Sequence, residues 1–220
     1  MKFVVTAGPT REYLDPVRFL SNPSTGKMGF AVARVAAMRG HEVVLVAGPV
    51  SLKTPKGVRR IDVTSAREML AAVERELSQQ APGTVFVSTA AVADWRPAKC
   101  ASRKLKKGQM SDTLRLVRNP DILKTVARRA KHQAPACAST IFVGFAAETN
   151  DVIAEARHKC REKNLDMIVA NDVTEKGSGF GVDTNRVTFV RKDGSVERLP
   201  LMTKLAVARR IVRECEDLRP

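Results

Sequence analysis

The sequence predicts a Rossmann-like α/β fold, a mostly parallel sheet with helices on both faces. Short apolar runs alternate along its 220 residues with amphipathic stretches of helical length, which is typical of strand–helix units. A glycine-containing turn follows the first apolar run, as in nucleotide-binding units. Near the other end, Asp193-Gly194 separates two short β-type runs and indicates a hairpin. We therefore expect a single domain over residues 1–220, with a C-terminal β-hairpin and helix at about 186–217.

The first unit is expected to run from a strand at residues 3–6 to a strand at 43–47. Between them, a helix from near Gly29 to Arg39 would place Phe30 and Ala37 on one face. Gly40 supplies the stop signal for that helix.

The next elements are a helix capped by Ser65, a strand at 85–88 and a helix capped by Asn119. Glu68, three residues after Ser65, completes a capping box, and the helix should end near Gln79. Residues 99–111 are polar and basic without periodicity, so we expect a mobile loop there. The remaining elements are strands at 141–145, 167–170, 187–190 and 196–199, and helices at 151–163 and 203–216.

The charge balance points to anionic partners. Lys and Arg number 38 against 23 Asp and Glu, a net charge of +15. Nucleic acid is one candidate partner, but one Trp, one Tyr and eight Phe form no base-stacking pattern. A phosphorylated small substrate explains the charge equally well. No apolar run approaches the roughly 20 residues of a membrane span, and the N-terminus leads straight into a strand, so we expect a cytoplasmic protein.

Ligands of open parallel sheets bind beyond the carboxyl ends of the strands. About twenty residues separate the first strand from its helix, far more than the usual two to six. That segment holds Arg11, Asp15, Arg18, Asn22, Ser24, Thr25, Gly26 and Lys27, side chains or backbone suited to anion binding.

Three generic motifs fail. A Walker sequence around Gly26-Lys27 would need Gly at Ser21 and Ser or Thr at Met28. The first turn reads Ala-Gly-Pro-Thr rather than G-x-G-x-x-G, and the only tyrosine, Tyr13, is not followed by a lysine four residues on. An oxidoreductase of the Rossmann type is therefore a remote alternative.

Residues 6–12, 15–22 and 24–29 nevertheless resemble the opening signature of phosphopantothenate–cysteine ligases in their stand-alone bacterial form. The resemblance continues in family order through 90–96, 104–107, 119–123, 143–149, 163–166, 171–173 and 199–204. Thr25 departs from it, because the family usually has serine there. Many bacterial relatives carry a flavin-dependent decarboxylase ahead of this unit, whereas these motifs start near Met1, so neither flavin nor decarboxylase activity is expected.

The resemblance implies a two-step reaction. The carboxylate of 4′-phosphopantothenate attacks the α-phosphate of CTP, pyrophosphate leaves, and the amine of cysteine then displaces CMP from the acyl-cytidylate. Mg²⁺ would be held mainly by the phosphates. The segments 104–107 and 119–121 read as bacterial, which favours CTP over the ATP of eukaryotic members. A homodimer formed through C-terminal sheet elements is also implied.

By the same resemblance, Asn22, Lys104 and Arg18 act in catalysis, and Arg18, Asn22 and Lys27 bind the substrate. Nucleotide contacts are expected from Ser88, Thr89, Ala90, Asp94, Lys104, Pro120, Asp121, Ile122, Leu123, Phe145, Lys159 and Lys163. Without the family, the residue types alone favour plainer roles for several of these: a turn asparagine, a solvated basic loop and a core phenylalanine. Three alternatives stay open: the same ligase using ATP, a basic nucleic-acid-binding module, and the oxidoreductase.

Overall fold

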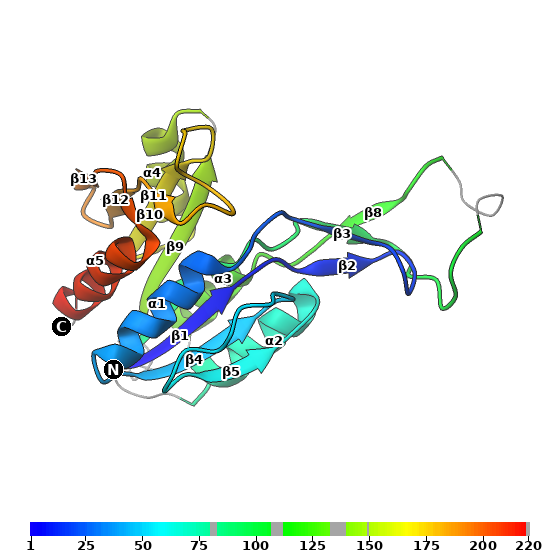
Figure 1. Cartoon of the computed structure of the whole chain (residues 1–220), viewed down its shortest axis with the longest axis horizontal. Helices are drawn as coiled ribbons and strands as arrows, with labels where there is room; N and C mark the ends of the chain where they lie inside the picture. The colour runs from blue at the N-terminus through cyan, green and yellow to red at the C-terminus, as the bar shows by residue number, and fades with distance from the viewer. Residues whose placement is uncertain (80–82, 107–111, 133–139, 149, 219–220) are drawn as a thin grey trace.

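A computed structural model describes residues 1–79, 83–106, 112–132, 140–148 and 150–218. Within these ranges an eight-stranded sheet has the order β13-β12-β10-β9-β6-β1-β4-β5 (Figure 1). Its strands are β1 (Lys2–Ala7), β4 (Glu42–Ala47), β5 (Arg59–Asp62), β6 (Thr84–Ser88), β9 (Ile141–Glu148), β10 (Met167–Asp172), β12 (Thr188–Arg191) and β13 (Val196–Arg198). All neighbouring strands from β10 to β5 are parallel, and β12 and β13 add an antiparallel edge.

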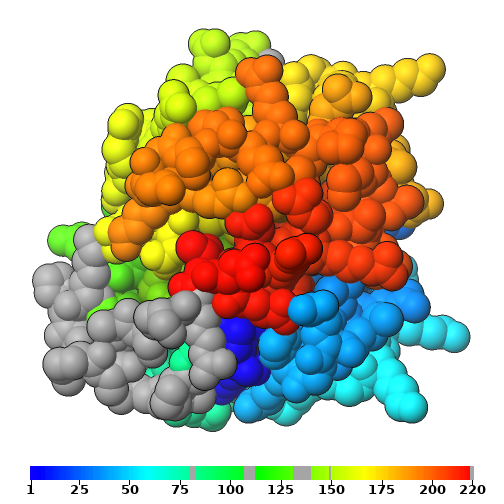
Figure 2. All heavy atoms as spheres, turned by 90° about the vertical axis from the view of Figure 1, so that its left-hand side faces the viewer, coloured from blue at the N-terminus to red at the C-terminus, as the bar shows by residue number. Residues whose placement is uncertain are grey.

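Helices cover both faces of this sheet. Helices α1 (Lys27–Met38) and α5 (Lys204–Asp217) pack on one face and share a core with β1, β4 and β12. Helices α2 (Ala66–Leu77), α3 (Ile122–His132) and α4 (Val152–Glu162) contribute to the core on the other face. Figure 2 shows the C-terminal helix in red lying directly against the blue segment that contains α1. The predicted fold class is confirmed.

The central strands are apolar because both of their faces are covered. Every residue of β1 is buried, and only the first residue of β4 is exposed, so neither strand alternates polar and apolar side chains. The buried end of Lys2 is neutralised by Glu76, 3.3 Å away, whose own side chain is buried. Burial of the apolar strands against two helical layers therefore holds the sheet together.

Local signals predicted several boundaries correctly. The Ser65 side chain accepts a hydrogen bond from the Glu68 amide, so the predicted cap is present. The Glu68 carboxylate reaches back to the Thr64 amide, one residue before the cap, rather than to the Ser65 amide of a strict capping box. Thr203 caps α5 as Ser65 caps α2. Gly194, at φ +88°, makes the turn between β12 and β13, as the Asp-Gly pair predicts.

Other features were not predicted. β2 (Arg11–Tyr13) pairs with β3 (Phe19–Ser21), and β7 (Trp95–Pro97) pairs with β8 (Leu116–Arg118). β2 lies against β7, and the two ladders form an arm that extends from the sheet (Figure 1). β5 and a short ladder of β11 (Thr184–Asn185) with β14 (Met202–Thr203) were also missed.

The expected cap of α3 is wrong. The Asn119 side chain donates to the Ala93 carbonyl at 2.7 Å and accepts from Arg96, so it is not available to the helix. Asp121 caps α3 instead, accepting from the Lys124 amide at 2.9 Å. The expected loop at 99–111 lies partly outside the described residues, and its described part runs into the arm. No helix in the described ranges is both long and apolar enough for a transmembrane segment.

Candidate functional site

The sheet changes winding direction between β1 and β6. From β1 the chain passes to β4 and β5 on one side and later to β6, β9 and β10 on the other. At such a switch point the loops above the strand ends diverge and leave a crevice for a ligand. The loop after β1 and residues 89–91 after β6 meet there through a backbone hydrogen bond from Ala91 N to Gly8 O at 2.9 Å.

The amino end of α1 opens into this crevice. Gly26 precedes the helix at φ +78°, a conformation that favours glycine, and no side chain among the described residues caps the helix. Gly29 allows the helix to approach the sheet, because a Cβ there would lie 2.5 Å from Ala7 Cβ and 2.4 Å from Thr89 Oγ1. The first amides of α1 are therefore free to donate to an anion.

A cavity of about 110 Å³, called the switch-point cavity below, occupies the crevice. Its walls come from segments far apart in the sequence. They are residues 24–29, 89–91, Phe145, Ala147, Asn171, 179–180, Asn185 and Lys204. The cavity therefore combines helix amides, small residues and amide or ammonium side chains, a combination suited to a phosphorylated ligand.

Five of the predicted site residues meet at this cavity. Lys27, Thr89, Ala90 and Phe145 line it, and the Asn22 side-chain amide donates to the carbonyl of Ala91, another lining residue, at 3.0 Å. Thr89 Oγ1 donates to Thr6 O at 2.6 Å, which holds the loop after β6 against β1. Ser88 is the last residue of β6, directly before this loop.

Lys27 is also tied to the loop after β10. Its ammonium donates to the Gly181 carbonyl at 2.7 Å and pairs with Asp183 at 2.8 Å. This contact lowers the pKa of Asp183 from its usual value. The lysine thus bridges two walls of the cavity.

Three buried polar residues of the cavity, Asn171, Asn185 and Lys204, were absent from the predicted set. Asn171, near the end of β10, is 7% exposed. Lys204, at the start of α5, is also 7% exposed. A polar residue directly after the apolar run of β10 was the available signal for Asn171.

A second group of predicted residues gathers at the start of α3. The Asp94 side chain is exposed. The backbone carbonyl of Asp94 accepts a hydrogen bond from the backbone amide of Asn119 at 2.8 Å, which places Pro120 and Asp121 beside the loop after β6. Ile122 and Leu123 are 4% and 7% exposed core residues, so only their backbone is available to a ligand. Lys163 pairs with Asp121 at 2.8 Å, and Lys159 pairs with Glu148 at the end of β9.

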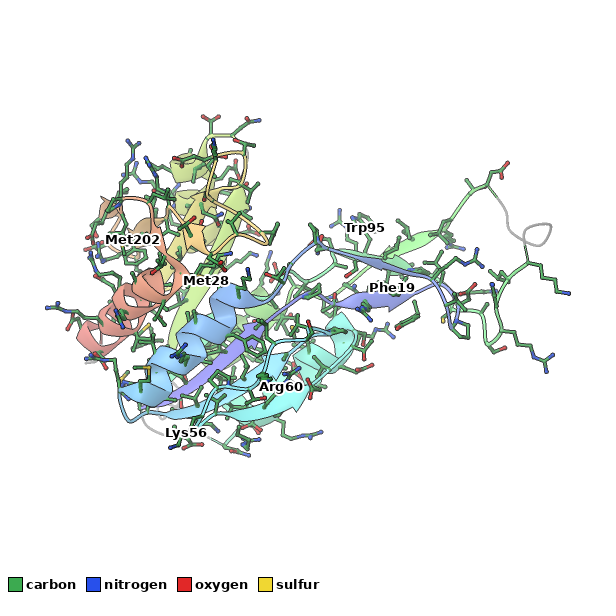
Figure 3. The ribbon with its side chains drawn as sticks, in the orientation of Figure 1. Phe19, Met28, Lys56, Arg60, Trp95 and Met202 are labelled. Carbon is green, nitrogen blue, oxygen red and sulfur yellow. The ribbon has the colours of Figure 1, made fainter. Side chains whose placement is uncertain are left out.

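Arg18 and Lys104 lie apart from both groups. The Arg18 guanidinium pairs with Asp15 and donates to Leu105 O at 2.9 Å, and Lys104 is exposed in the neighbouring loop. Figure 3 shows the arm residues Phe19 and Trp95 well away from Met28, which lines the switch-point cavity. The structure therefore divides the predicted site residues among the cavity, the start of α3 and the arm.

Comparisons with known proteins show the family of the chain and support its fold. The family described as the DNA/pantothenate metabolism flavoprotein C-terminal domain matches residues 1–218. Coenzyme A biosynthesis bifunctional protein CoaBC from Bacillus subtilis is 50% identical over 216 residues, covering 98% of this chain and 51% of that protein. The protein of that name from Escherichia coli K12 is 46% identical over 226 residues, covering 100% of this chain and 53% of its own length.

This chain thus spans about half the length of the curated relatives it matches. Among solved structures, the C-terminal domain of CoaBC superposes with a TM-score of 0.80 at 43% identity. That match covers 99% of this chain and 94% of the other.

Proposed function

The chain belongs to the family of the DNA/pantothenate metabolism flavoprotein C-terminal domain, and from this we propose that it is a phosphopantothenate–cysteine ligase of coenzyme A biosynthesis. The observation that carries the proposal is the switch-point cavity. Its walls are built by residues 24–29, 89–91, Phe145 and Asn171, which lie in or beside the segments that resemble such ligases. Helix amides and lysines suit it to phosphorylated substrates.

We infer a reaction in two steps. The carboxylate of 4′-phosphopantothenate attacks the α-phosphate of CTP, which forms an acyl-cytidylate and releases pyrophosphate. The amine of cysteine then attacks the acyl carbon, and CMP leaves. The residues of the chain act by positioning and by stabilising charge.

The cavity residues receive the reacting groups in this proposal. The α1 amides and Lys27 bind anionic oxygens, and the Asn22 amide donates to the acyl-cytidylate. Asn22 has a second amide hydrogen beyond the one donated to Ala91 O. Its position between the two loops after β1 and β6 suits this role.

The nucleotide is proposed to extend from the cavity toward the start of α3. Asp94 accepts from the exocyclic amine of cytosine, and Phe145 flanks the base. The backbone of 88–90 and of 120–123 contributes further contacts, and Lys159 and Lys163 exchange their present carboxylate partners for the nucleotide.

Magnesium is proposed to assist by neutralising phosphate charge. Within the described residues no three His, Cys, Asp or Glu side chains cluster in a way that would hold a metal ion. The ligands of Mg²⁺ would therefore come mainly from the substrate phosphates and water.

We also propose that the chain acts as a homodimer in the cytoplasm, with residues 1–220 as one synthetase unit. The edge strand β13 carries charged side chains, such as Glu197 paired with Arg191 and Arg210, and charges on an edge strand discourage pairing with another chain. Exposed apolar side chains gather instead on the arm, where Phe19 is 38% and Trp95 45% exposed. This favours the arm over the C-terminal sheet as the dimer contact.

The test is a reaction with defined substrates. Purified protein is incubated with 4′-phosphopantothenate, Mg²⁺ and either CTP or ATP, with and without cysteine, and the products are identified by mass. We expect CMP from CTP, and phosphopantothenoylcysteine only when cysteine is present. AMP from ATP in its place would refute the nucleotide assignment alone. If neither CMP nor AMP forms, the ligase proposal is refuted, and nucleic-acid binding becomes the alternative to test.

A further inference from the structure

Residues 199–204 resemble the ligase family but have no part in the mechanism above. Their last residue, Lys204, is the first of α5 and is 7% exposed. It lines the switch-point cavity and also an adjoining groove of about 820 Å³, whose walls come from α1, residues 52–56, Asp183 and the start of α5. Lys27 is shared by both hollows as well. Figure 3 labels Met28 and Met202, which lie at the starts of α1 and α5.

The ammonium of Lys204 has few partners for a buried cation. It donates to the Gly179 carbonyl at 3.0 Å, and it forms no ion pair with any carboxylate of the described residues. The nearby Asp183 is already paired with Lys27 at 2.8 Å. Burial and the charge of Lys27 both lower the pKa of Lys204. Asp183 thus lies near both lysines but is paired only with Lys27.

Such an arrangement is stabilised by an anion. A buried charge is costly without a partner, and an ammonium has three hydrogens to donate. The backbone of Lys204 is fixed, because Thr203 caps α5 directly before it and the helix packs into the core. A phosphate oxygen in the cavity would accept from the hydrogens that Gly179 leaves free.

We propose that Lys204 binds a phosphate group of a substrate in the switch-point cavity, together with Lys27. This inference rests on the proposed ligase function and adds a substrate-binding residue to it. The phosphate belongs either to the nucleoside triphosphate or to the phosphate monoester of 4′-phosphopantothenate, and both present the same oxygens to the lysine.

Binding measurements on variants separate these sources. Lys204→Met removes the charge at similar length, and Lys204→Gln removes the charge but keeps a donor for Gly179. Lys176→Met makes the same change at an exposed lysine outside both hollows. The dissociation constants of CTP and of 4′-phosphopantothenate are measured separately by calorimetry for each variant, and folding is followed by thermal unfolding.

We expect both Lys204 variants to raise the dissociation constant of one ligand by roughly 10- to 100-fold, the usual effect of losing a charge-assisted hydrogen bond. The ligand whose affinity falls is the one whose phosphate contacts Lys204. Lys176→Met should leave both dissociation constants unchanged. If Lys204→Met does not fold, Lys204→Gln provides the same comparison. Unchanged affinity for both ligands in the Lys204 variants, with or without a lower unfolding temperature, would refute the inference and leave the ligase proposal intact. A wild-type chain that binds neither ligand would overturn both.

Discussion

Asp15 organises the base of the loop that carries Arg18. Its carboxylate is fully buried and accepts from the Val17 and Arg18 amides at 2.9 Å, from the Arg18 guanidinium and from the Leu105 amide at 3.1 Å. The Arg18 guanidinium, first among these, holds the pKa of Asp15 well below its usual range. One carboxylate thus joins residues 15–18 to the loop beside Lys104, and the two catalytic candidates of the arm are held in one unit.

Asp15→Asn should release that unit, because an amide cannot accept on both of its terminal atoms. We expect hydrogen exchange at the Leu105 amide to rise roughly tenfold or more. In the wild type, a lowered pKa means that the carboxylate stays charged as the pH falls through the usual aspartate range. Its stabilising contribution is therefore present near pH 4 and is lost only below that, as the folded pKa is passed. Asp217→Asn, at an exposed carboxylate, is the control; equal exchange in both variants would contradict the role of Asp15.

At the scale of elements, the contact between α1 and the sheet determines the cavity. Gly29 lies where the helix meets β1 and the loop after β6, and it lines the cavity itself. A Cβ atom added at this position would lie 3.0 Å from the Thr6 carbonyl oxygen and still closer to side-chain atoms of Ala7 and Thr89. Relief of the clash requires the helix to move away from the strand, since the backbone of β1 is paired on both sides.

Gly29→Ala should therefore lower the free energy of unfolding by about 1–3 kcal/mol, as overpacking usually does. It should also weaken nucleotide binding, because the α1 amides move with the helix. Gly40→Ala is the matched control: its Cβ meets nothing within 4 Å, and only the strain of φ +83° opposes it. Denaturant unfolding and calorimetric titration with CTP test both effects. Nucleotide affinity that falls equally in the two variants would argue against a cavity set by the α1 contact.

At the scale of the whole molecule, the arm separates Arg18 and Lys104 from the cavity. The guanidinium carbon of Arg11 lies 4.6 Å from the centroid of the Phe19 ring, and that of Arg118 lies 5.3 Å from the Trp95 ring. Each exposed ring therefore has a cation next to it. If the arm of one subunit packs on the body of the other, C₂ symmetry makes the two contacts equivalent. We expect Arg18 to act on the cavity of the partner subunit.

Mixing two variants tests this arrangement. Arg18→Ala and Asn22→Ala should each have low ligase activity as purified homodimers. After co-refolding at equal amounts, half of the dimers are mixed and each carries one intact site, so activity should recover to about a quarter of the wild type. Activity that stays at the average of the two variants would place Arg18 and Asn22 in the same site of one subunit. A monomer in sedimentation would refute the dimer itself.

The sequence by itself determined the features that depend on neighbouring residues. The Ser65 cap, the Asp193-Gly194 turn and the alternation of strands and helices arise within a few residues, and all are present. The sequence also predicted that ligands bind beyond the carboxyl ends of the parallel strands, and the cavity lined by residues 24–29 and 89–91 lies at that edge of the sheet.

Only the tertiary structure decided which residues share a site. Asn119 does not cap α3, because its side chain bonds to Ala93, 26 residues away. The arm pairs residues 95–97 with 116–118 across a long polar segment that has no local strand signal. Lys204 reaches the cavity through the packing of α5 against α1, whereas Arg18 lies on the arm, paired with Asp15. These contacts join segments distant along the chain, and neither spacing nor propensity records them.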